Sequence, residues 1–116
     1  MVIDDEEMVS EMACEMLAPE GLKVLTAEGG AAGLALFKER RSEIGLVLLD
    51  FSMPGMSGEQ TFEELRKINP DVPVILSSGY GEEETTRRFE GKGLSGFIQK
   101  PYTPDALLAE IRRCLG

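Results

Sequence analysis

The sequence alternates five times between a short apolar run and a longer stretch with helical spacing. The most apolar run covers residues 44–49 (I-G-L-V-L-L), with five apolar residues in six, and it ends on Asp50. A strand that is apolar on both faces is typical of the interior of a parallel sheet. Parallel strands need crossover connections, which are right-handed and usually helical. The alternation therefore predicts an α/β fold, a doubly wound parallel sheet with helices on both faces.

Turn-forming residues separate the predicted elements. Pro19-Glu20-Gly21 ends the first helix, and a loop rich in such residues, 51–58, follows the central strand. No repeat, linker or low-complexity stretch interrupts the pattern, so residues 1–116 are predicted to form a single domain. The predicted strands are 1–3, 22–26, 44–49, 72–76 and 94–99, and the predicted helices are 6–18, one opening at 29–30, 59–68, 82–89 and 105–115.

Charge and composition exclude several classes of function. The net charge is −9, from 21 acidic and 12 basic residues. Binding to nucleic acid requires a positive surface, so a nucleic-acid-binding function is not expected. The apolar runs are too short for a membrane span or a signal peptide, which predicts a soluble, non-secreted domain without direct membrane contact. The absence of histidine excludes Ser-His-Asp and Cys-His catalysis and any phosphohistidine within this chain. Cys14 and Cys114 have no metal-binding spacing and are predicted to be inert, buried thiols.

Residues with reactive or metal-binding side chains directly follow the predicted strands. Asp4 and Asp5 follow the first strand, Asp50 the third, Ser78 the fourth and Lys100 the fifth. Each alone suits an ordinary role, as a helix cap, a turn residue or a surface ammonium group. Together they occupy the edge of the sheet where open parallel sheets bind ligands. Clustered carboxylates repel one another and require a cation, and hard oxygen ligands suit Mg²⁺.

Five short motifs follow one another across nearly the whole chain. They are D-D at Asp4-Asp5, L-V-L-L-D ending at Asp50, M-P-G-M-S-G over 53–58, P-V-I-L-S-S-G-Y over 73–80, and K-P at Lys100-Pro101. In this order and spacing they resemble the receiver (response regulator) family of two-component signalling. The resemblance implies a flavodoxin-like (βα)5 fold with strand order 2-1-3-4-5, and a phosphoacceptor signalling domain that is not an enzyme in its own right.

The resemblance also implies roles for the residues around the acidic cluster. Asp50 is the implied phosphoacceptor. Asp5 is implied to bind Mg²⁺ directly, Asp4 to bind it mainly through water, and Asp50 and the main-chain carbonyl of Ser52 to complete the protein ligands. Ser52 and Tyr80 fall on the positions that tune the lifetime of the phosphorylated state.

A second group of residues is implied to respond to the phosphoryl group. Ser78 and Lys100 match the hydroxyl and the cation that bind it. Phe97 falls on the aromatic switch position, where, lacking a hydroxyl group, it can act by packing only. The Lys100-Pro101 peptide resembles one that is cis in this family. The surface expected to change comprises the helix at 82–89, the strand at 94–99 and the helix at 105–115.

The residues of two motifs, S-S-G-Y and F-I-Q-K-P-Y, are most similar to those of receivers at the carboxyl end of hybrid sensor histidine kinases. The implied phosphodonor is a histidine kinase, a histidine phosphotransfer domain or a small phosphodonor. The implied location is the cytoplasm, including the cytoplasmic part of a larger sensor kinase. The resemblance also allows a homodimer that forms through the fourth helix, the fifth strand and the fifth helix.

Three alternatives differ from this assignment. A receiver-like interaction module would keep the fold without phosphotransfer. A small phosphatase with an Asp nucleophile would need a second acidic residue soon after Asp50, and none occurs before Glu59. A flavin-binding domain would need a phosphate-binding loop after the first strand, where the sequence has only acidic residues.

Overall fold

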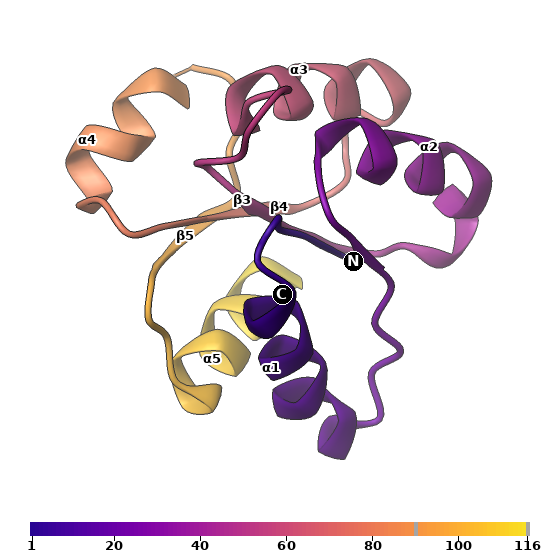
Figure 1. Ribbon diagram of the computed structural model, residues 1–116, viewed down its shortest axis with the longest axis vertical. Helices are drawn as coiled ribbons and strands as arrows, with labels where there is room; N and C mark the ends of the chain where they lie inside the picture. Colours follow the sequence, from indigo (N-terminus) through magenta and orange to yellow (C-terminus); the bar gives the residue numbers. More distant parts are fainter. Residues whose placement is uncertain (90, 116) are drawn as a thin grey trace.

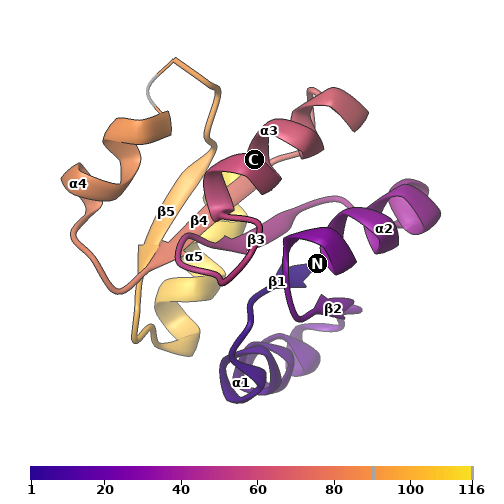
Figure 2. The same cartoon turned by 45° about the horizontal axis from the view of Figure 1, so that its top comes forward.

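Five parallel strands form a single sheet in the order β2-β1-β3-β4-β5. The computed structural model describes residues 1–89 and 91–115. The predicted doubly wound parallel sheet and its strand order are confirmed. Figure 2 shows β5 at one edge of the sheet, next to α4 and α5, and β2 at the other edge. The strands are β1 (Val2–Ile3), β2 (Thr26–Ala27), β3 (Val47–Asp50), β4 (Val74–Ser78) and β5 (Gly96–Gln99).

The α-helices within residues 1–89 and 91–115 cover the two faces of the sheet (Figure 1). The helices α1 and α5 lie on one face, and α2, α3 and α4 lie on the other. None of the helices within 1–89 and 91–115 has the length and apolar character needed to cross a membrane. Their bounds are α1 (Glu7–Leu17), α2 (Gly30–Arg40), α3 (Gly58–Ile68), α4 (Glu82–Thr86) and α5 (Pro104–Leu115).

Two apolar layers, one on each face, hold the helices to the sheet. Along β3, Leu48 packs in the layer under α1 and α5, whereas Leu49 packs in the layer under α2, α3 and α4. Both side chains are almost fully buried. Successive residues of a strand point to opposite faces, so a central strand covered on both sides must be apolar at every position. This is why the run that ends on Asp50 shows no alternation.

Several predicted elements differ in extent. The third, fourth and fifth strands begin at Val47, Val74 and Gly96 instead of residues 44, 72 and 94. The second strand begins at Thr26 instead of residue 22, because the ladder between β1 and β2 contains only the pairs Val2↔Thr26 and Ile3↔Ala27. The predicted helix at 82–89 is helical in α4 only as far as Thr86 and tightens into a 3-10 turn over Arg87–Phe89. Because α4 contributes only Thr85 to the buried interior, packing does little to extend it.

The loop after β3 is held close to Asp50 by the start of α3. The Ser57 hydroxyl accepts a hydrogen bond from the Gln60 N–H, and the Gln60 side chain accepts one from the Ser57 N–H, each 3.1 Å long, which forms a capping box. At Gly58, a Cβ atom would lie 2.6 Å from the carbonyl oxygen of Asp50 and 2.9 Å from Cα of Phe51. Only glycine therefore lets α3 begin this close to the end of β3.

Candidate functional site

Three carboxylates meet where β1 and β3 end. Oxygens of Asp4, Asp5 and Asp50 lie within 4.8 Å of one another. The strand register explains this. Ile3 of β1 pairs with Leu49 of β3, so Asp4 and Asp50, the residues that come next, lie side by side on neighbouring strands. Asp4 and Asp50 are buried, at 2% and 3% exposed, whereas Asp5 is exposed to solvent. The sequence prediction placed these three residues together, and the structure does the same.

Lys100 brings a positive charge to the cluster from the end of β5. Its Nζ lies 2.9 Å from Asp4 Oδ2, 3.2 Å from Asp50 Oδ1 and 3.4 Å from Glu6 Oε1. Its backbone N–H donates to the Ser78 carbonyl at 2.7 Å, which fixes the residue to the end of β4. Burial lowers the pKa of Lys100, but the hydrogen bonds and ion pairs with Asp4 and Asp50 outweigh it and raise the pKa above its ordinary value. The ammonium group is therefore charged at neutral pH.

Asp50 is the carboxylate whose ionisation costs most. Burial and repulsion from Asp4 raise its pKa to about 7, although Lys100 acts in the opposite direction. Near neutral pH the side chain is thus divided between its protonated and ionised forms. A further cation beside Asp50 would shift it to the ionised form, which is the nucleophilic one.

The donor set fits a divalent cation. With all three aspartates ionised, the cluster carries three negative charges against the single ammonium of Lys100, so a charge of two remains to be balanced. Asp4 is held in place because its Oδ1 accepts a hydrogen bond of 2.9 Å from the Glu6 N–H. Several carboxylate oxygens, with an exposed member open to water, match the ligands that Mg²⁺ takes in proteins.

Ser78 ends β4, the strand that pairs with β3, and its hydroxyl is bonded to the following loop and to α4. Asp50 pairs with Ser77 in the register, so Ser78 stands one residue beyond it. The Ser78 hydroxyl accepts hydrogen bonds from the Tyr80 N–H at 3.0 Å and from the Thr85 hydroxyl at 3.3 Å. Its side chain therefore faces α4 in this structure rather than Asp50 or Lys100.

The remaining predicted residues lie around the cluster rather than within it. Phe97 is half-buried in β5 and lines a hollow of about 500 Å³ between α4 and α5. Tyr80 is 57% exposed and meets the Phe51 ring edge-on at 6.4 Å. Ser52 is exposed in the loop after β3 and shares a second hollow with Tyr80 and Thr85. The Lys100–Pro101 peptide bond is cis.

Three residues with a place at the site were not singled out from the sequence. Glu6 adds a carboxylate to Lys100, and the acidic run that continues after Asp5 was a signal for it. Thr85 reaches Ser78 from α4, whose sequence E-E-E-T-T gives no apolar signal of its burial. The Tyr102 hydroxyl is buried without a hydrogen-bond partner among the described residues. Burial raises the pKa of Tyr102, and Asp4 adds to the effect.

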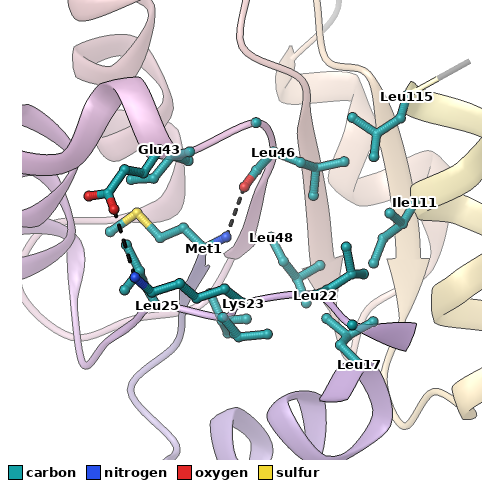
Figure 3. A pocket seen from close by; sticks show the side chains of 15 residues that line it. Met1, Leu17, Leu22, Lys23, Leu25, Glu43, Leu46, Leu48, Ile111 and Leu115 are labelled. Atoms are coloured by element: carbon teal, nitrogen blue, oxygen red, sulfur yellow. Dashed lines mark hydrogen bonds and ion pairs between the residues drawn. The ribbon is translucent and has the colours of Figure 1, made fainter. Parts of the chain in front are cut away.

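A separate apolar cavity of about 280 Å³ lies where the strands begin, at the opposite end of the sheet from the aspartates (Figure 3). Aliphatic side chains such as Leu17, Leu48 and Ile111 line most of it, and an ion pair of 3.7 Å between Lys23 and Glu43 borders it. The Met1 amine donates to the Leu46 carbonyl at 2.9 Å, and burial lowers the pKa of this amine to about 6. No cluster of carboxylates lines this cavity, so the acidic edge is the better candidate site.

Comparisons with known proteins agree with this geometry. Residues 1–112 match the model of the response regulator receiver domain. The chain is 33% identical to the transcriptional regulatory protein GlrR of Escherichia coli, in an alignment of 111 residues that covers 96% of this chain. It is 30% identical to the sensor kinase CckA of Brucella abortus, in an alignment of 115 residues that covers 99% of this chain. Among solved structures, the complex of CheX, CheY, BeF₃ and Mg²⁺ from Borrelia burgdorferi contains a similar chain, with 25% identity, a TM-score of 0.89, and coverage of 95% of this chain and 83% of that one.

The curated relatives are much longer than the matched region. The chain corresponds to 24% of GlrR and to 12% of CckA, so it spans a quarter or less of their length. The similarity therefore concerns one domain of these proteins. The rest of each relative has no counterpart in these 116 residues.

Proposed function

Because the chain belongs to the response regulator receiver family of two-component signalling, we propose that Asp50 is the residue that accepts the phosphoryl group. A receiver is a phosphoacceptor signalling module rather than an enzyme in its own right, so the alternative of a small phosphatase was wrong. One observation carries the assignment to Asp50. It is a buried carboxylate with a pKa raised to about 7, held between two other aspartates and a lysine.

We propose that the cation of the site is Mg²⁺, held by Asp5, Asp50 and the main-chain carbonyl of Ser52, with Asp4 acting mainly through water. The surplus of negative charge in the cluster supports a divalent cation. Bound there, Mg²⁺ would neutralise charge on the transferring phosphoryl oxygens. The exposed position of Asp5 is consistent with a ligand that the ion reaches directly from solvent.

In the proposed transfer, an oxygen of ionised Asp50 attacks phosphorus, and the bond between phosphorus and the imidazole nitrogen of the donor breaks. The leaving imidazole belongs to the donor, because this chain contains no histidine. Lys100 stabilises the ionised form of Asp50 and, with its Nζ 3.2 Å from that carboxylate, stands where it can pair with an incoming phosphoryl oxygen. Phosphoryl transfer of this kind depends mainly on positioning and charge neutralisation.

Ser78 and Lys100 are the residues proposed to bind the aspartyl phosphate once it forms. The new phosphoryl oxygens accept strong hydrogen bonds, and the Ser78 hydroxyl, which now accepts hydrogen bonds from Tyr80 and Thr85, would turn towards them. Such a movement would change the loop after β4 and the surface of α4, β5 and α5, with Phe97 repacking in the adjacent hollow. This is a population shift between two arrangements. Ser52 and Tyr80, at the mouth of the site, are proposed to tune how fast water removes the phosphoryl group.

The proposed donor is a histidine kinase or a histidine phosphotransfer domain. The relatives include a sensor kinase and a transcriptional regulator, which supports a role as one module of a signalling protein in the cytoplasm. The Borrelia complex pairs a related CheY with the protein CheX, and protein partners are accordingly expected here as well. A homodimer through α4, β5 and α5 is the further assembly that we propose to test by sedimentation with and without beryllofluoride.

The experiment that tests the assignment is intact-mass measurement after incubation with acetyl phosphate and Mg²⁺. The parent should gain one phosphoryl group and the Asp50→Asn variant none. Beryllofluoride, which forms a stable mimic of the aspartyl phosphate, controls for fast hydrolysis. If the parent shows neither a phosphoryl adduct nor a response to beryllofluoride, phosphotransfer is wrong and an interaction module without phosphotransfer takes its place.

A further inference from the structure

A pair of buried hydroxyl groups links the end of β4 to α4. Ser78 and Thr85 are each 1% exposed, and the Thr85 hydroxyl donates to the Ser78 hydroxyl oxygen at 3.3 Å. Thr85 is the buried residue of α4. Its backbone N–H donates to the Gly81 carbonyl at 3.1 Å, which fixes its place in the helix. The hydroxyl contact thus joins the residue proposed to bind the phosphoryl group to the helix proposed to respond.

The neighbouring threonine behaves differently. A threonine in a helix commonly donates its hydroxyl to the carbonyl four residues earlier. Thr86 does so, with a bond of 2.7 Å to the Glu82 carbonyl, and its interaction stays within α4. For Thr85, Ser78 is the hydroxyl's partner among the described residues. The Thr85 contact is therefore the one that spans two elements.

Turning Ser78 towards Asp50 would break this contact. The Ser78 hydroxyl has one proton and two acceptor positions, and both of its present contacts, with Tyr80 and Thr85, hold it on the side of α4. A buried hydroxyl that loses its partner raises the free energy of the state in which this happens. The movement of Ser78 is thus opposed unless Thr85 moves or rotates as well.

We propose that Thr85 is a positioning residue that holds the Ser78 hydroxyl against α4 in the unphosphorylated protein and sets how readily phosphorylation displaces it. This inference rests on the proposed role of Ser78 in binding the phosphoryl group. The short helix α4 has five residues, and Thr85 is its buried side chain. The contact between the two hydroxyl groups therefore couples displacement of Ser78 to displacement of α4.

The proposal predicts a gain of affinity when the contact is removed. Thr85→Val keeps nearly the same shape but cannot donate a hydrogen bond, so it removes the restraint from the unphosphorylated state only. One neutral hydrogen bond corresponds to a change of roughly two- to tenfold in an equilibrium constant. Beryllofluoride with Mg²⁺ should accordingly bind Thr85→Val about two- to tenfold more tightly than the parent. Damage to the fold would instead weaken binding.

The test is a beryllofluoride titration followed by calorimetry and by the amide chemical shifts of residues 78–86. Thr85→Ser keeps the hydroxyl and should resemble the parent. Thr86→Val makes the same change at the adjacent position and is the matched control, also expected to resemble the parent. Without beryllofluoride, the Thr85→Val shifts should already lie part of the way towards the bound spectrum. Thr85→Ala serves as a second variant with the same expected direction if valine disturbs folding.

Equal or weaker binding by folded Thr85→Val would overturn the proposal while leaving the role of Asp50 intact. The same substitution in a Ser78→Ala background tests the pair directly, because the gain should vanish when its partner is absent. A gain that persists without the Ser78 hydroxyl would also refute the contact as its cause. If the parent itself does not bind beryllofluoride, the proposed phosphoacceptor function fails, and the role of Thr85 fails with it.

Discussion

The Asp50→Asn variant should be more stable than the parent, and the difference should grow with pH. Asp50 is 3% exposed and lies beside Asp4, and these surroundings raise its pKa from the ordinary 3.8 to about 7. Between these two pH values the folded protein keeps a proton on Asp50 that the unfolded chain has released. The contribution of Asp50 to the free energy of unfolding is therefore fully present below pH 3.8 and is lost as the pH rises towards 7. Asparagine carries no charge and escapes this loss.

The size of the effect follows from the two pKa values. At about 1.36 kcal/mol for each pKa unit, the difference between 3.8 and about 7 corresponds to about 4 kcal/mol at pH 8 in the absence of a metal ion. Roughly 1.5 kcal/mol of this is already lost at pH 5, so the gap between variant and parent should widen by about 2–3 kcal/mol from pH 5 to pH 8. Typical domains have a stability of about 5–15 kcal/mol, so a change of this size is large.

The measurement is urea unfolding of parent and variant at several pH values, with EDTA present to remove divalent ions. Glu43→Gln, which changes an exposed carboxylate at the opposite end of the sheet from the aspartates, is a matched control and should show no widening gap. Adding Mg²⁺ at pH 8 should stabilise the parent more than Asp50→Asn, because binding to the folded state adds to stability. A gap that stays constant from pH 5 to pH 8 would refute the claim that burial and Asp4 hold the Asp50 pKa high.

Substitutions at three other positions test the rest of the site. Gly58→Ala should disturb the end of β3, because its Cβ would meet backbone atoms at 2.6 and 2.9 Å. It should therefore lower both the stability of the protein and its phosphorylation by acetyl phosphate. Gly79→Ala is the control, because a Cβ there meets nothing within 4 Å. Asp5→Ala should abolish Mg²⁺ binding in a titration at little cost in stability, since Asp5 is exposed, and an unchanged titration would contradict the metal assignment. Lys100→Ala should leave the fold intact yet prevent phosphorylation from changing the α4–β5–α5 surface in hydrogen exchange, and a response like that of the parent would make its switching role wrong.

Much of the fold could be predicted from the sequence because each part of it has a local signal. The run that ends on Asp50 is apolar on both faces, and its burial in the structure between two helical layers is what that pattern requires. The positions of Asp4, Asp5 and Lys100 after strands predicted a common edge, since parallel strands deliver their carboxyl ends to the same side. The acidic cluster and its lysine follow from topology alone.

The features that could not be predicted depend on contacts between distant elements. The second strand was predicted to begin four residues too early because strand propensity does not reveal how far a neighbouring ladder extends. The orientation of the Ser78 hydroxyl depends on Thr85, which lies in a helix whose sequence, E-E-E-T-T, has no apolar periodicity. Likewise, the contribution of Asp4 to the raised pKa of Asp50 depends on a residue distant in sequence, although the apolar run before Asp50 already indicates its burial.

The energetics of the acidic edge link stability to signalling. Without a metal ion, burial and repulsion from Asp4 oppose the ionisation of Asp50 more than Lys100 favours it. The same arrangement favours binding of a divalent cation, because the cation relieves repulsion that the fold itself imposes. In the proposed mechanism, phosphorylation would remove the Asp50 carboxylate from this balance and add oxygens that compete for Lys100 and Ser78. In the proposed mechanism, the contact of 3.3 Å between the Ser78 and Thr85 hydroxyl groups lies between the acidic edge and α4. If this contact breaks when Ser78 turns towards the phosphoryl group, as we propose, one added group would change the surface of α4 without unfolding the domain.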